Sequence, residues 1–373
     1  MSFYYNGFGT QTPKVSISQT DSATLAAEFC SPTEAQSRLL PILYRRTTVQ
    51  RRHSVLLEPS GSHNGGAADP INQTFYTLAH DRHDRGPTTA TRMQAYERYV
   101  SELGVSASRK AIVASGMELD SITHLITVSC TGFSAPGLDI ALVRELGLSP
   151  DIARTHIGFM GCHGAMNAIR VANAFVEADP NHRVLSCAVE LCSLHHQYGW
   201  HPERIVSNAL FADGAAAFVA SKNRQPDSTP QLEHVASGSF VVPGTESMMS
   251  WRISDHGYEM TLSPRVPEII RESLPDWLSP WLEKQGYGLS DIGGWAVHPG
   301  GPRILDATAA ALQLKQEDLS ASRDVLKQYG NMSSPTVLFV LKQLQRKQIA
   351  GPYVMLGYGP GLTIEAALLR SSD

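Results

Sequence analysis

The chain has 373 residues, of which 42% are hydrophobic and 18% are charged, a balance typical of a globular enzyme with a sizeable core. Its formal net charge of −4 argues against nucleic acid as the main partner. No apolar run reaches the roughly 18 residues of a membrane helix, and the N-terminus does not read as a signal peptide. Five cysteines without a CxxC pair fit a reducing compartment, so we expect a cytoplasmic protein with no membrane partner.

Helices and strands are predicted to alternate along the first 220 residues. An amphipathic helix and then a basic segment are expected over 31–53, followed by a loop rich in Gly, Ser and Asn over 58–70. Apolar residues recur at helical spacing from 91 to about 117. Beyond it, strands are predicted over 124–129, 155–160 and 183–190, and helices over 138–148 and 164–178.

The second part of the chain repeats this alternation after a polar segment, 221–230, which is the predicted linker. Strands are expected over 231–242, 293–298, 353–358 and 362–370, and helices over 265–285 (interrupted by prolines), 301–314 and 333–347. Such alternation is typical of an α/β protein whose helices pack on a buried sheet, and it hints at a duplicated unit.

A cysteine at position 162 lies where an apolar run reaches a glycine and a helical pattern begins at once. At the first turn of a helix, free N–H groups and the helix dipole favour an anion and lower the pKa of a thiol. This placement predicts a nucleophile for acyl chemistry. The alternative is a small buried cysteine that only fills the core.

His298 and Asn331 are two further candidates, each at a boundary between predicted elements. His298 ends an apolar strand before Pro-Gly-Gly-Pro, and sheet ends are where α/β proteins place their sites. It has the alternative of being a core histidine bonded to a backbone carbonyl. Asn331 precedes a predicted helix, so its amide either donates to an oxyanion or caps that helix.

Three weaker patterns complete the candidates. The segment GYGPG at 357–361 is followed by a strand, which excludes a dinucleotide fingerprint but allows backbone to approach a reacting group. His195, His196 and His201 lack ligands at metal-binding spacing, so no metal site is predicted. The basic cluster holds Arg45, Arg46, Arg51 and Arg52, and it is either a solvated face or a contact for an anionic cofactor tail.

Five motifs occur in one order at long spacings: GCHGAMNAIRVA, NALFADGAAAF, WAVHPGGPRIL, YGNMSSPTVLFVL and GYGPGLTIEAALLRS. With them, the chain from about Val15 to Arg370 resembles the type III polyketide synthases of the chalcone synthase superfamily, in their bacterial branch. The resemblance implies a thiolase-like fold, with two duplicated α/β halves in an α-β-α-β-α arrangement, residues 1–227 and 228–373. It also implies a homodimer.

The resemblance assigns roles to residues that match the family's motifs. Cys162 matches the acyl-accepting nucleophile, and His298 and Asn331 match its two catalytic partners. Phe211 matches the phenylalanine that gates the channel between the coenzyme A tunnel and the active-site cavity. The glycine-rich loop that shapes the cavity wall corresponds to Gly357, Gly359, Pro360 and Gly361.

The chemistry implied is an acyltransferase reaction with a decarboxylative condensation. Cys162 takes an acyl group from a starter acyl-CoA and extends it with malonyl-CoA, and His298 holds the thiolate as an ion pair. Cyclisation then gives a pyrone, resorcinol, phloroglucinol or naphthalene skeleton. The coenzyme A thioesters are substrates, and no cofactor or metal is implied.

Departures from the plant pattern fall at positions expected to shape substrate binding. Cys130 stands near a plant threonine and either lines the cavity or holds an extra intermediate. His195 falls near a position that tunes cavity size, and Met260 near a second gating phenylalanine. Ala135 replaces a methionine that reaches into the partner subunit's cavity. Among the basic coenzyme A contacts, Arg46 alone matches clearly.

Two other hypotheses about the function remain open at this point. The first is a related condensing enzyme, similar to ketoacyl-ACP synthase III or to hydroxymethylglutaryl-CoA synthase. The carrier-protein enzymes normally use a basic patch, which the acidity of this chain disfavours. The second is a non-catalytic acyl-binding protein that has lost turnover, against which the joint presence of Cys162, His298 and Asn331 argues.

Overall fold

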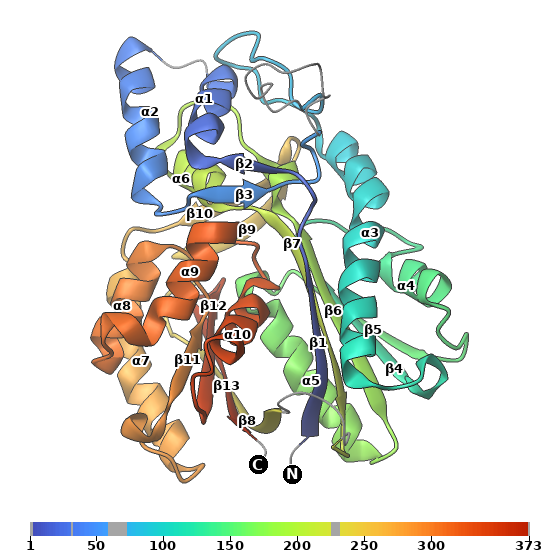
Figure 1. Ribbon diagram of the computed structural model, residues 1–373. Coiled ribbons are helices and arrows are strands. Elements are labelled where there is room, and N and C mark those ends of the chain that lie inside the picture. The colour runs from blue at the N-terminus through green and yellow to red at the C-terminus, as the bar shows by residue number, and fades with distance from the viewer. Residues whose placement is uncertain (1–2, 31–32, 59–72, 225–231, 372–373) are drawn as a thin grey trace, which may run out of the picture.

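The computed structural model describes residues 3–30, 33–58, 73–224 and 232–371, and Figure 1 shows their arrangement. In the first half the elements are β1 (Phe3–Gln11), β2 (Ser16–Ser18), α1 (Gln19–Cys30), α2 (Glu34–Arg46), β3 (Arg51–His53), α3 (Thr89–Ser115), β4 (His124–Ser129), α4 (Leu138–Leu146), β5 (Ala153–Gly158), α5 (Gly164–Ala178), β6 (Arg183–Leu191), α6 (Pro202–Leu210) and β7 (Asp213–Ser221). The second half comprises β8 (Leu232–Val241), β9 (Met249–Ser254), β10 (Gly257–Leu262), α7 (Val266–Glu283), β11 (Gly294–Val297), α8 (Pro302–Leu312), α9 (Ser320–Tyr329), α10 (Thr336–Arg346), β12 (Tyr353–Gly359) and β13 (Thr363–Ser371).

Nine of the strands form one mixed sheet in the order β11-β12-β13-β8-β1-β7-β6-β4-β5. The sequence of antiparallel and parallel pairings is the same on both sides of the β1–β8 pair. In one direction β1–β7 and β7–β6 are antiparallel and β6–β4 is parallel; in the other, β8–β13 and β13–β12 are antiparallel and β12–β11 is parallel. Four strands of each half therefore have the same topology, and β5, parallel to β4, is an additional edge strand of the first half. The predicted boundary at 227/228 falls within 225–231, outside the described residues.

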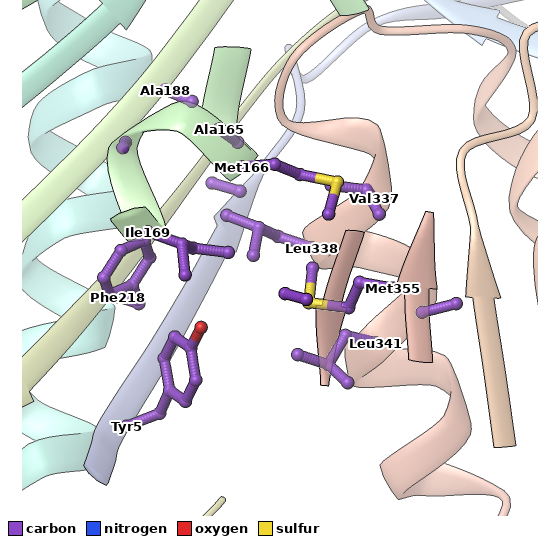
Figure 2. Close-up of a cluster of buried hydrophobic side chains, with 14 of the residues drawn as sticks. Tyr5, Ala165, Met166, Ile169, Ala188, Phe218, Val337, Leu338, Leu341 and Met355 are labelled. Atoms are coloured by element: carbon purple, nitrogen blue, oxygen red, sulfur yellow. The ribbon is translucent and has the colours of Figure 1, made fainter. Parts of the chain in front are cut away.

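Three apolar cores separate the layers of the molecule. The central core joins α5 and α10 to strands of both halves, and in Figure 2 Met166 and Ile169 of α5 face Leu338 and Leu341 of α10. A second core packs α3 and α4 on β4, β6 and β7, and a third packs α7 and α8 on β11, β12 and β13. Figure 1 shows the resulting order of helices, sheet, central helices, sheet and helices. This confirms the predicted α/β layering.

A small cap of α1, α2 and β3 covers α6 (Figure 1), through contacts that include Leu40, Tyr44, Ile205 and Ala209. Sequence patterns predicted only the helix of this cap. The predicted loop over 58–70 lies outside the described residues apart from Glu58. The elements α1, β1, β2, α6, β7, β9, β10 and α9 were also not predicted.

One predicted interruption is wrong, because α7 runs unbroken from Val266 to Glu283 although Pro275 and Pro280 lie inside it. Each proline removes one backbone donor and disfavours a helix interior. Leu274, Leu278 and Leu282 on the buried face of α7 are fully buried in the third core. Their burial offsets the missing hydrogen bonds, since packing routinely overrides local preference.

Candidate active site

Cys162 lies on a single 3-10 turn, Gly161–His163, between the end of β5 and the start of α5. The turn is tight because Gly161 has a φ of +76°, and a side chain there would come within 2.4 Å of the Pro360 ring. The predicted position at a helix start is therefore correct to within a turn. The thiol itself is buried.

The electrostatic surroundings of Cys162 differ from the expectation for a helix start. Burial raises the pKa of the Cys162 thiol to about 11, although side-chain hydrogen bonding from Ser333 and Asn331 opposes this shift. Removal of water from an anionic sulfur costs more than the dipole of one helix turn returns. In this structure the neutral thiol is favoured at pH 7.

His298 follows β11 directly and is 1% exposed. Its backbone N–H donates to Leu356 O at 2.8 Å, which extends the parallel β11–β12 pairing by one residue. Neither ring nitrogen has a hydrogen-bond partner among the described residues. Burial, with His163 nearby, lowers the pKa of His298 to about 3. The alternative of a core histidine bonded to a carbonyl is therefore wrong, because the ring is neutral, buried and unpaired.

Asn331 precedes α10 and presents its amide to the cysteine. Its Oδ1 accepts a hydrogen bond from the Ser333 backbone N–H at 2.8 Å, which orients Nδ2 toward Cys162, 4.0 Å from Sγ. Ser333 lies two residues on, before the helix starts, so the local bond and the inward-facing donor are both present. Asn331 does not cap α10, because the N-cap of this helix is Pro335 and no side-chain bond caps it. The capping interpretation is therefore wrong, and donation by the amide to an oxyanion stays a prediction.

The catalytic pocket is a cavity that brings the three predicted catalytic residues together. It has a volume of about 30 Å³. Phe211 and Met260 also line it, together with Leu210, Gly300, Ile304 and Tyr358 among others. A smaller adjoining cavity shares Cys162, Phe211 and Met260 and adds Cys130, Thr131, Cys192, Trp251 and Pro360.

Cys130 lies behind Cys162. Its sulfur accepts a hydrogen bond from Gly161 N–H at 3.1 Å, and its own thiol faces Gly161 O at 3.6 Å. Burial and the nearby Glu190 carboxyl raise the pKa of Cys130 well above its usual range. These contacts give Cys130 a supporting position beside the turn that carries Cys162.

His195 does not line the catalytic pocket. It lines a larger side pocket of about 110 Å³, whose wall also includes Phe29, Tyr76, Trp251 and Met260. Its Nε2 faces Thr131 O at 2.7 Å and its Nδ1 faces the Tyr258 backbone N–H at 3.0 Å. These partners define one neutral tautomer, and burial lowers its pKa to about 3.

The glycine-rich loop is only partly at the cavity. Pro360 lines the adjoining cavity, whereas Gly357 and Gly359 pack on His163: a side chain at Gly359 would lie 2.3 Å from its ring. Gly361 has a φ of +124°, which favours glycine at the turn between β12 and β13. In this chain Gly357 and Gly359 leave room for the imidazole of His163, the residue after Cys162.

Arg46 lies at the end of α2 and lines an outer pocket of about 520 Å³ with Arg303. Leu210, Gly300 and Ile304 border both the outer pocket and the catalytic pocket. A basic, open pocket thus adjoins the buried catalytic pocket. Within the described ranges, no group of three His, Cys, Asp or Glu side chains has an arrangement that fits a metal ion.

Trp251 and Glu190 are two site residues that the sequence patterns did not identify. Trp251 lines both the adjoining cavity and the side pocket, and its Nε1 donates to Cys130 O at 2.7 Å. Glu190 is fully buried and accepts from Ser334 Oγ (2.5 Å), Thr131 Oγ1 (2.8 Å) and Cys130 N–H (2.9 Å). A charged residue within the apolar run RVLSCAVEL was a signal for Glu190.

Comparison with known proteins gives the family. The N-terminal domain model of the chalcone and stilbene synthases matches residues 78–223, and the C-terminal domain model matches residues 233–373. The chain belongs to the chalcone and stilbene synthase family. It is a type III polyketide synthase, a condensing acyltransferase, and this confirms the resemblance. The family assignment disfavours the two alternatives, a different condensing enzyme and a non-catalytic acyl-binding protein. The family uses coenzyme A thioesters as substrates without a further cofactor.

Similar proteins come from bacteria, plants, an amoeba and an alga. The chain is 31% identical over 370 residues to "Alpha-pyrone synthesis polyketide synthase-like Pks18" of Mycobacterium tuberculosis, covering 97% of this chain and 89% of the relative. It is 32% identical over 340 residues to type III polyketide synthase C of Arabidopsis thaliana, covering 88% and 84%.

Solved structures of the family share the fold. The C-terminal type III polyketide synthase domain of Steely1 from Dictyostelium superposes with a TM-score of 0.89 at 25% identity, over all of both chains. The synthase PKS-I of the brown alga Ectocarpus siliculosus gives a TM-score of 0.88 at 28% identity, over 100% of this chain and 99% of the other. The predicted thiolase-like fold is confirmed. No helix in the part of the chain that the structure describes is long and apolar enough to span a membrane.

Proposed function

We propose that Cys162 is the acyl acceptor of this synthase and that His298 and Asn331 are its catalytic partners. The observation that carries the proposal is the neutral, unpaired His298 ring beside an amide directed at a buried thiol. Buried polar groups normally have partners, so these unpaired donors and acceptors point to a substrate that supplies them. Phe211, which borders the catalytic pocket, the adjoining cavity and the side pocket, is proposed as the gate.

Loading of the starter begins with two neutral groups. A free ring nitrogen of His298 accepts the thiol proton as the Cys162 sulfur attacks the thioester carbon. The tetrahedral intermediate then expels coenzyme A, which takes the proton from the imidazolium and leaves as a thiol. This order replaces the standing ion pair expected from the sequence, since burial disfavours charge on either group alone.

Extension of the chain uses two hydrogen-bond donors, His298 and Asn331. An N–H of neutral His298 and the Asn331 amide donate to the thioester carbonyl of malonyl-CoA. As the carboxylate leaves as carbon dioxide, its bonding electrons form an enolate whose oxygen these donors stabilise. The enolate carbon attacks the acyl group on Cys162, the sulfur leaves as a thiolate, and the lengthened chain is now a β-ketoacyl-CoA. The Cys162 thiolate then attacks this new thioester, and coenzyme A leaves as the chain returns to the cysteine.

Coenzyme A is proposed to enter through the outer pocket. Arg46 and Arg303 supply positive charge for its phosphates, and the pocket leads past Leu210 and Gly300 to the catalytic residues. Of the predicted coenzyme A contacts, Arg46 thus has a supporting position. Met260, Cys130 and Pro360 are proposed to contact the acyl chain from the walls of the two inner cavities.

A homodimer formed through the β5 edge is proposed for the active form. β5 is the last strand of the sheet at this edge, and four of its six residues are exposed. Phe133 is 56% exposed, and Phe159 and Met160 beside it are also exposed. An unpaired edge with adjacent apolar side chains is a surface that a second copy covers. Light scattering of the purified protein tests this, and an active monomer would contradict it.

The products are proposed to be cyclised polyketides of the pyrone, resorcinol, phloroglucinol or naphthalene type. The name of the mycobacterial relative, which refers to α-pyrone synthesis, supports the first of these. The test is incubation with labelled malonyl-CoA and a panel of long-chain, aromatic and short starters, followed by mass spectrometry. Products carrying label in two-carbon steps support the proposal, whereas an intact protein that releases no decarboxylative product with any starter contradicts it.

A cytoplasmic location is also proposed. All five cysteines are free and buried in this structure, which fits a reducing compartment. Cell fractionation with an antibody against the native protein tests this, and recovery of the protein outside the cytoplasm would contradict it.

A further inference from the structure

The carbonyl groups at the end of α6 have an unusually complete set of partners. The last carbonyls of a helix lack partners within it, and they must find donors elsewhere when buried. Gln19 Nε2 donates to Ala209 O at 2.8 Å, and the Asn331 backbone N–H donates to Leu210 O at 2.8 Å. Arg52 completes the set, since its Nη1 donates to both Asn208 O (2.5 Å) and Phe211 O (2.9 Å).

The position of the Arg52 side chain suits it to bind these carbonyls. It lies on β3 in the cap, with its guanidinium carbon 5.8 Å from the centre of the Tyr44 ring. Its Nη1 donates to the two carbonyls, and its Nε has no acceptor among the described residues. A cation at a helix C-terminus is favoured by the helix dipole, which partly offsets the cost of burying it.

The carbonyl that Arg52 holds belongs to the proposed gate, and the gate is bonded to the catalytic amide. Phe211 and Asn331 form an isolated parallel bridge, in which Asn331 N–H donates to Leu210 O and Ala212 N–H donates to Asn331 O at 2.9 Å. The stem of Arg52 also lies against Gly330, the residue before Asn331: a Cβ added at Gly330 would be 3.1 Å from Arg52 Cγ. One side chain thus contacts both segments.

We propose that Arg52 is a positioning residue for the reaction, which fixes the Phe211 backbone and, through the Phe211–Asn331 bridge, the Asn331 amide. The inference rests on the proposed function, but it concerns a residue outside the catalytic pocket and acts through backbone carbonyls. Loss of Arg52 frees the gate and lets the amide move relative to Cys162. Enolate formation and its capture by the acyl-cysteine then become less well coupled.

The test uses Arg52→Met and Arg52→Lys, with Arg51→Met as the matched control. Arg51 is the preceding residue on the same strand, and its exposed side chain donates to Ser16 Oγ at 2.8 Å, away from the gate. The measurements are KM for malonyl-CoA, kcat for polyketide, the ratio of free acetyl-CoA to condensed product, and the melting temperature.

For Arg52→Met we expect the ratio of acetyl-CoA to polyketide to rise about tenfold, since small displacements of a catalytic group cost factors of this order or more. Arg52→Lys retains a donor and should lie between Met and the parent, and Arg51→Met should match the parent. The proposal would be overturned if Arg52→Lys gave the same ratio of acetyl-CoA to polyketide as the parent and Arg52→Met, where it folds, did so too. An inactive parent would instead contradict the proposed function, so the two failures are distinguishable.

Discussion

Asn331 Nδ2 lies 4.0 Å from Cys162 Sγ, although 169 positions separate the two residues in the chain. Each residue precedes a helix of the central layer, Cys162 before α5 and Asn331 before α10. Because the halves share one topology, these helices are equivalent elements whose first turns converge. The proposed nucleophile and its proposed amide partner therefore come from corresponding places in the duplicated fold.

Replacement of Asn331 by aspartate removes the N–H donor of the side chain but keeps the oxygen that accepts from Ser333. The change keeps an oxygen for the Ser333 N–H but replaces the inward N–H donor with a second acceptor. We expect malonyl-CoA decarboxylation to fall about 100-fold, the usual cost of losing one oxyanion donor. Steady-state release of carbon dioxide measures this. A rate within twofold of the parent would show that the amide does not contact the enolate.

Trp251 is predicted to limit the length of the acyl chain. It lines both the adjoining cavity near Cys162 and the side pocket, which is several times larger, as do Cys192, Phe211 and Met260. Trp251→Ala should connect the two and raise kcat/KM for long-chain over short-chain starters by about tenfold, within the range that pocket size commonly controls. Trp251→Phe, which keeps most of the bulk, is the control. An unchanged preference in the alanine variant would place the chain elsewhere.

Glu190 is predicted to make stability depend on pH. Burial raises the pKa of Glu190 from 4.5 to about 7, so the folded protein holds the proton more tightly than the unfolded chain does. Its contribution is greatest below pH 4.5 and is lost as the pH rises through 7, which amounts to roughly 3 kcal/mol. Glu190→Gln should remove this fall.

Urea unfolding of the parent and of Glu190→Gln between pH 5 and 8 measures the effect. The parent should lose stability relative to the variant across this interval. Parallel curves for the two proteins would mean that Glu190 is ionised throughout, with its charge balanced by the hydroxyl and amide donors around it.

Buried neutral histidines have the opposite dependence on pH. Burial lowers the pKa values of His195 and His298 to about 3, so the unfolded chain binds protons that the folded protein does not. Their contribution is complete above pH 6.5 and is lost as the pH falls toward 3. We expect the free energy of unfolding of His195→Gln to fall less than that of the parent between pH 6.5 and 4.5. Equal falls would assign the acid sensitivity to other groups.

Regular elements with strong periodicity could be predicted from the sequence. The helix over 164–178 and the strand over 124–129 match α5 and β4 residue for residue, since a buried helix face and a buried strand carry local patterns. The candidate catalytic residues were chosen from motifs at the ends of such elements and from the family resemblance, and their roles stay predictions. These positions need no knowledge of distant contacts.

Features that depend on contacts between distant segments could not be predicted. Trp251 lines both cavities because the β9–β10 hairpin places it against Cys130, 121 positions away. The pKa of Cys162 was misjudged for the same reason, because burial by other segments outweighs the local helix dipole. The role of Gly359 likewise depends on the His163 ring packed against it.

The central claim, that Cys162 accepts the acyl group, is tested most directly by intact-protein and peptide mass spectrometry after incubation with a starter acyl-CoA alone. The account predicts that the parent gains the mass of one acyl group, located on the peptide that carries Cys162. Cys162→Ala should gain none, although Cys130 and Cys192 lie in the same cavity. Acylation of Cys162→Ala to the level of the parent, on Cys130 or on any other residue, would contradict the account.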